Sequence, residues 1–110
     1  MGSKIKESEG KIFVALMLFV MKDSWFQLTK AKRRALTREH VGTLSKFSNK
    51  VWITHLSGTG LSKYDLIEIL ESDDIMAIEG MIGAFKTGAK ARHGDLRDIV
   101  LMEKGIDQLL

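Results

Sequence analysis

The chain contains neither cysteine nor proline, and it has a single tyrosine among its 110 residues. Without cysteine, disulfide bonds, thiolate metal sites and cysteine nucleophiles are excluded, and nothing argues for secretion. Without proline, no predicted helix or strand carries the residue that most often interrupts one. We therefore expect a disulfide-free protein of the cytoplasm.

Long hydrophobic segments are also missing. The longest nearly continuous apolar run spans residues 12–21, about half of the roughly 20 residues that a membrane helix needs. No cleavage-site pattern follows it, so it is not typical of a signal peptide. Hydrophobic residues make up 45% of the chain and charged residues 28%, which is ordinary for a globular protein. We expect a flexible tail over residues 1–10 and one folded domain over residues 11–110.

Four segments have the β-branched, aromatic or alternating content of strands, and two have helical periodicity. The expected strands span residues 11–21, 51–56, 64–70 and 96–103, and the expected helices span residues 30–47 and 75–88. This βαββαβ order predicts an α+β, ferredoxin-like fold, with a four-stranded antiparallel sheet and both helices on one face. The first strand is apolar on both sides, so the other face of the sheet needs a cover. We predict a homodimer or higher homo-oligomer, a dimeric α/β-barrel assembly.

The net charge is +3 and the isoelectric point is near 9.3. One group of positive side chains lies on the first predicted helix: Lys30, Lys32, Arg33, Arg34 and Arg38. No aromatic residues alternate with these charges, as a platform for stacking nucleic-acid bases requires. The pattern favours a solvated helix face, and nucleic-acid binding is kept as an alternative.

One histidine lies within the apolar stripe of the first predicted helix. The stripe consists of Leu36, His40, Leu44 and Phe47. A neutral imidazole among apolar groups is a suitable axial ligand for haem iron, although a hydrogen-bonded core histidine fits the stripe as well. His55 and His93 lie outside this helix, so we expect no non-haem metal site. The acidic residues Glu68, Glu71, Asp73 and Asp74 are expected to be surface or capping groups.

The order of several residues resembles the C-terminal, haem-carrying domain of the chlorite dismutase family, which also contains the coproheme decarboxylases. The resemblance covers residues 12–106 and is carried by Trp25-Phe26-x-Leu28, Arg33 or Arg34, Leu36, Glu39-His40, Gly60-Leu61, Asp65 and Glu71-Ser72-Asp73-Asp74. It implies haem b or a related iron porphyrin as cofactor. It also implies that His40 is the proximal iron ligand and that Trp25 and Phe26 lie beside the haem.

The sequence departs from the family pattern at positions where the family has functional residues. The distal arginine of chlorite decomposition falls at Ile53, which cannot donate a hydrogen bond to an oxyanion. The tyrosine of the decarboxylases falls near Phe13, whereas the chain's tyrosine is Tyr64. The acidic partner of the proximal histidine falls near Lys90. Family subunits usually carry two such domains, so this chain either pairs with itself or is one domain of a larger product.

Three hypotheses follow. The first is a homo-oligomeric, chlorite dismutase-like haem-binding protein, in which His40 ligates iron and Ile53, Leu36 and Leu44 line an apolar pocket; its implied activity is peroxidase-type oxidation. The second is a haem-free dimeric α/β-barrel protein that binds a small molecule, with His40 as a core residue. The third is a basic module that binds nucleic acid.

Overall fold

The computed structural model describes residues 11–47 and 49–105. The predicted tail at residues 1–10 lies outside this range. The elements follow one another as β1 (Lys11–Met21), α2 (Asp23–Phe26), α3 (Lys30–Ser45), β2 (Trp52–Ser57), β3 (Leu66–Ser72), α4 (Ile75–Thr87), the 3-10 helix η1 (Ala89–Arg92) and β4 (Gly94–Gly105).

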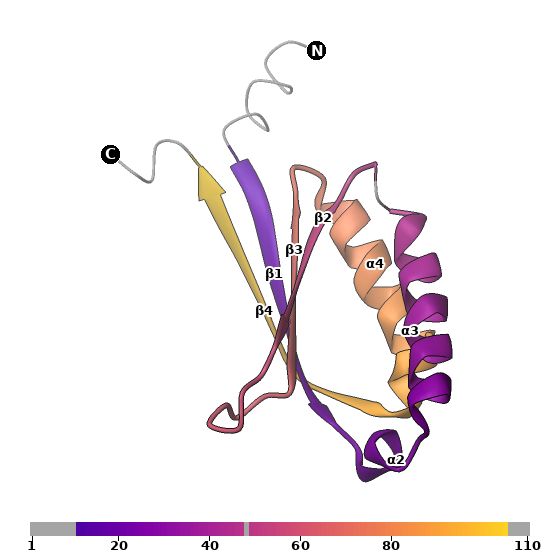
Figure 1. The fold of residues 1–110 in the computed structure, drawn as a ribbon. Helices are drawn as coiled ribbons and strands as arrows, with labels where there is room; N and C mark the ends of the chain where they lie inside the picture. Colours follow the sequence, from indigo (N-terminus) through magenta and orange to yellow (C-terminus); the bar gives the residue numbers. More distant parts are fainter. Residues whose placement is uncertain (1–10, 48, 106–110) are drawn as a thin grey trace.

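The four strands form one antiparallel sheet in the order β2-β3-β1-β4. Helices α3 and α4 lie side by side on the same face of this sheet (Figure 1). The predicted α+β, ferredoxin-like fold is therefore confirmed. Its central strand β1 pairs with β4 along its whole length, from Lys11 opposite Gly105 to Met21 opposite Gly94.

Local hydrogen bonds explain where the elements begin. The hydroxyl of Thr29 accepts from the backbone N–H of Lys32 at the start of α3, and the carboxylate of Asp74 accepts from two backbone N–H groups at the start of α4. These caps satisfy N–H groups that have no partner within the helix. Strand β3 begins two residues later than predicted, and the carboxylate of Asp65, just before it, accepts a hydrogen bond from the N–H of Met21 at the end of β1.

The hydrophobic core lies between the sheet and α4. Ala15, Met17 and Phe19 alternate along β1 and face the helices. Helix α4 buries Ala77, Ile78, Met81 and Phe85 against them. Full burial of one large apolar side chain contributes about 1.5–3 kcal/mol, so this layer supplies most of the burial that holds the domain together.

The opposite face of the sheet carries a second set of apolar side chains, which we call the open face. Cross-strand register places its members together: Val14, Leu16, Leu18, Trp52, Leu56, Ile67, Ile69, Val100 and Met102. Trp52 is 75% exposed, and Leu56, Val100 and Met102 are also exposed. In the described part of the chain, no helix has the length and apolar character to cross a membrane.

Candidate functional site

His40 projects from α3 into the space between this helix and the sheet. Its side chain is only 4% exposed, and its ring centroid lies 4.8 Å from that of Phe85 on α4. Leu44 is buried and Leu36 is half-buried on the same side of α3. The prediction that His40 points inward from an apolar stripe is confirmed.

A carboxylate from the sheet meets this imidazole. The Nε2 atom of His40 lies 2.9 Å from Oε1 of Glu68. Glu68 is on the buried side of β3 and has no exposed surface. The prediction that Glu68 is a surface or capping group is wrong. Strand β3 carries apolar residues on both of its faces. Its sequence pattern therefore does not indicate which face the helices cover.

A second histidine completes the arrangement. His55 of β2 is the cross-strand partner of Glu68, and residues directly opposite each other project from the same face of an antiparallel sheet. The Nε2 atom of His55 lies 3.3 Å from the same Oε1 atom. We call His40, His55 and Glu68 the histidine–glutamate cluster; one ligand atom from each lies within 4.8 Å of the others. His55 lies outside the helix of His40, as expected from the sequence, but strand pairing brings it to the same carboxylate.

The electrostatics of Glu68 reflect this environment. Burial raises the pKa of its carboxyl, but the hydrogen bonds and charges of His40 and His55 outweigh that effect, so the pKa lies below its ordinary value. Both bonds reach Oε1. The second oxygen, Oε2, is buried and has no hydrogen-bond partner among the described residues. His40 therefore has an acidic hydrogen-bond partner that comes from β3.

The other predicted site residues lie outside the histidine–glutamate cluster. Ile53 is half-buried and packs against the hydrophobic core, two residues before His55 on β2. Trp25 is half-buried, with its ring centroid 6.2 Å from that of His93, and Phe26 is 58% exposed. The structure thus brings together His40 and two residues that the sequence did not indicate. The pairing of β2 with β3 places His55 directly opposite Glu68.

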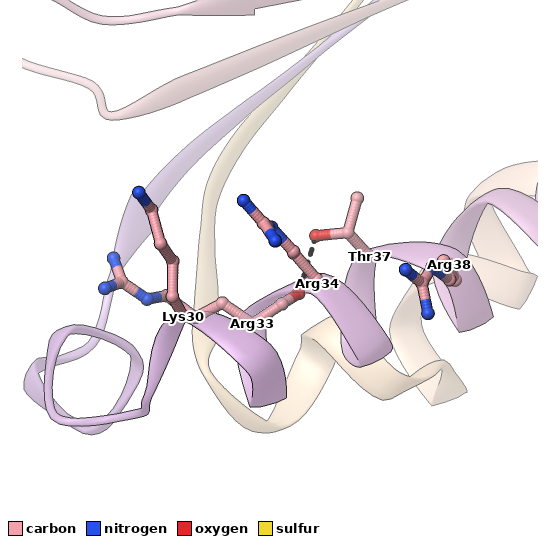
Figure 2. Close-up of a pocket in the computed structure, with 5 residues that line it drawn as sticks. All are labelled: Lys30, Arg33, Arg34, Thr37 and Arg38. Carbon is pink, nitrogen blue, oxygen red and sulfur yellow. Dashed lines mark hydrogen bonds between the residues drawn. The ribbon is translucent and has the colours of Figure 1, made fainter.

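The basic side chains of α3 border a hollow of about 420 Å³ on the helix surface. Its lining consists of Lys30, Arg33, Arg34, Thr37 and Arg38, and the Thr37 hydroxyl donates to the backbone carbonyl of Arg33 (Figure 2). Within the described residues, the buried Nε of Arg33 has no hydrogen-bond partner. We call this region the basic groove. Its lining comes from one helix, and it has the charge to attract an anion.

The fold and the cluster define a ferredoxin-like domain with a buried histidine–carboxylate pair between its first long helix and its sheet. Residues 2–98 match the chlorite dismutase family, and the chain belongs to this family. The resemblance inferred from the sequence is confirmed. Among the curated proteins, none matches the chain.

Solved structures with the same fold include a haem-binding protein from Thermus thermophilus, with a TM-score of 0.78 and 20% identity over 88% of this chain and 41% of that one. Chlorite dismutase from Candidatus Nitrospira defluvii in complex with imidazole gives a TM-score of 0.76 and 18% identity, over 96% of this chain and 49% of that one. A mutant of the same enzyme gives 0.75 and 19%, over 84% and 40%. The chain therefore spans less than half of the length of these proteins.

Proposed function

We propose that this chain is a homo-oligomeric, haem-free ligand-binding domain of the chlorite dismutase fold, with the histidine–glutamate cluster as its functional centre. The observation that carries the proposal is the burial of Glu68 and His40 between α3 and the sheet. Burying a carboxylate in a small domain lowers the stability of the fold unless the charge is paired. An apolar pair of similar volume often stabilises a fold as well as a buried ion pair does, or better. Buried ionisable pairs of this kind gather at functional sites.

The family implies haem as a cofactor, so we compare the residues around His40 with what a porphyrin requires. A metal–nitrogen bond of about 2 Å and a van der Waals contact of about 3.5 Å beyond the iron require roughly 5.5 Å between Nε2 and the nearest atom of the sheet. The Oε1 atom of Glu68 lies 2.9 Å from Nε2. The residues of this arrangement do not fit a porphyrin at His40, and we derive no haem-dependent step, peroxidase-type oxidation included.

Haem binding at His40 is the second candidate, favoured by family membership and by the haem-binding protein of the same fold. It requires Glu68 to leave Nε2 and α3 to move away from β3. In that open form Trp25, Phe26 and Ile53 would need to reach the haem, as the resemblance implies. The haem type, b or a related porphyrin, is part of this candidate.

Titration of the purified chain with haem separates the two candidates. We expect no stoichiometric Soret band, and the same weak background absorbance in the wild type, His40→Ala and the control His93→Ala. A stoichiometric band that His40→Ala abolishes and His93→Ala retains would instead establish haem binding through His40. Such a result would overturn the haem-free proposal.

The oligomer is proposed from the open face. Its apolar side chains extend across all four strands, with Leu16 of β1 opposite Ile69 of β3 and Val100 of β4. A second copy of the chain can cover this face by packing sheet against sheet, which buries about 800 Å² per partner in a stable interface. We expect a dimer or larger species in light scattering, and a monomer for Leu16→Lys. The control Leu61→Lys changes a fully exposed residue of the β2–β3 loop and should leave the oligomer intact. A monomeric wild type would contradict the proposal.

Nucleic-acid binding through the basic groove is an alternative that the same protein can test. Phosphate contacts make the affinity fall steeply with salt. We expect no salt-dependent binding of a short DNA duplex. Binding that weakens with salt and is lost on Arg34→Glu would favour this alternative.

A further inference from the structure

We propose that the histidine–glutamate cluster binds one divalent transition-metal ion, through Nε2 of His40, Nε2 of His55 and a carboxylate oxygen of Glu68. The inference deepens the proposed function, since it rests on the same buried centre and names its ligand. It replaces the iron porphyrin that family membership implies with a bare ion at the same histidine.

The spacing of the three donors matches a coordination sphere. Two ligands bound at about 2.1 Å around a tetrahedral ion lie about 3.4 Å from each other, and cis ligands of an octahedral ion lie about 3.0 Å apart. The Oε1 atom of Glu68 lies 2.9 Å from Nε2 of His40 and 3.3 Å from Nε2 of His55. Two of the three edges are therefore already at ligand–ligand distance, and no backbone rearrangement of β3 is needed to form them.

The second carboxylate oxygen provides an independent observation. Glu68 has no exposed surface, and its Oε2 atom has no hydrogen-bond partner within residues 11–47 and 49–105. A buried carboxylate oxygen without a partner is unfavourable. A cation beside the carboxylate would satisfy it, whereas a purely structural hydrogen bond with His40 leaves it unpaired.

The donor set selects the class of ion. Imidazole nitrogens with one carboxylate favour Zn²⁺ and Fe²⁺ over Mg²⁺ and Ca²⁺, which prefer oxygen ligands. Three protein ligands leave at least one coordination position for water or a substrate, as in catalytic sites. His55 is 43% exposed, whereas His40 and Glu68 are buried, so the open position faces the His55 side of the cluster.

The imidazoles have to give up the hydrogen on Nε2 when the ion binds. In the ion-free arrangement, Nε2 of each ring faces Oε1 of Glu68, which accepts that hydrogen. A metal ion needs the lone pair of Nε2, so the hydrogen moves to Nδ1 in a neutral ring and leaves to solvent from a protonated ring. The ion then takes the place of the two contacts with Oε1.

Titration of the full chain with Co²⁺ tests the proposal, because Co²⁺ has visible d–d bands that report nitrogen and oxygen ligands. We expect saturation at one ion per chain and competition by Zn²⁺. Replacing a residue that only supports a metal ligand weakens binding about 10- to 100-fold, so His55→Ala should weaken Co²⁺ binding at least 100-fold. His55 is the first choice because its exposure lets the variant fold.

Two further variants keep the test decisive. Glu68→Gln preserves the shape of the buried side chain but removes its charge, and should abolish the bands in a protein that circular dichroism shows to be folded. His93→Ala removes a histidine outside the cluster, which pairs with Ser24, and should bind Co²⁺ as the wild type does. Absence of Co²⁺ binding by the wild type, or equal binding by His55→Ala, would overturn the metal site.

The haem titration keeps the two proposals distinguishable. If neither haem nor Co²⁺ binds, the metal site is wrong and the haem-free centre stands. Stoichiometric haem uptake through His40 without Co²⁺ binding would overturn both.

Discussion

Helices α3 and α4 cover the same face of the sheet, but they are attached to it in different ways. Helix α4 buries Ala77, Ile78, Met81 and Phe85. Helix α3, whose residues 30–45 are all described, buries only His40 and Leu44, and much of its remaining surface is charged. A helix held by apolar burial does not depend on any single polar contact. A helix held partly by one polar contact depends on the chemistry of that contact, so we regard α4 as the scaffold and α3 as the element that responds to a ligand.

The largest effect should come from the scaffold helix. Ile78→Ala removes a side chain with no exposed surface and leaves a cavity in the core, which we expect to lower the free energy of unfolding by about 2–5 kcal/mol. The matched change Leu36→Ala, at a half-buried position of α3, should cost clearly less. Urea denaturation of the two variants measures the difference. Equal losses would contradict the division of roles between the helices.

A smaller effect should come from the contact that holds α3. His40→Leu leaves the buried carboxylate of Glu68 without its shorter hydrogen bond, and we expect a loss of about 1–3 kcal/mol. The double variant His40→Leu with Glu68→Leu replaces the pair by apolar groups and should recover most of this stability. Recovery of stability without recovery of Co²⁺ binding would separate function from folding. A double variant less stable than His40→Leu would show that the pair is structural.

The smallest effect should come from the caps at the helix starts. Asp74 accepts from the N–H groups of Met76 and Ala77, whereas Thr29 accepts from that of Lys32 at 3.2 Å. Loss of such a cap costs about 0.5–2 kcal/mol, and the charge of Asp74 also favours the positive end of its helix. Thermal unfolding should therefore show a larger loss for Asp74→Ala than for Thr29→Ala. The reverse order would mean that capping does not distinguish the two helices.

The fold could be predicted because its main signals are local. The apolar run of β1, the stripe with His40 and the capping residues each depend on a few neighbouring positions. Boundaries were less exact: β3 begins at Leu66 rather than at residue 64, and Asp65, just before it, accepts a long-range hydrogen bond from the N–H of Met21 that the local pattern does not indicate.

The site could be predicted only in part, for a reason that is also physical. The stripe places His40 inward, but the partners of that histidine depend on long-range register. The alternation along β3 assigns Glu68 to one face without indicating that the helices cover this face. His55 joins the cluster because it lies opposite Glu68 across two strands whose connecting loop carries no signal for that pairing.

The pairing of Lys11 with Gly105 has a consequence for how such domains are joined. The chain enters the sheet on β1 and leaves it on β4, at the same end and on adjacent strands (Figure 1). A segment joined before β1 and a segment joined after β4 would therefore extend from the same edge of the sheet, and neither junction would interrupt a core strand.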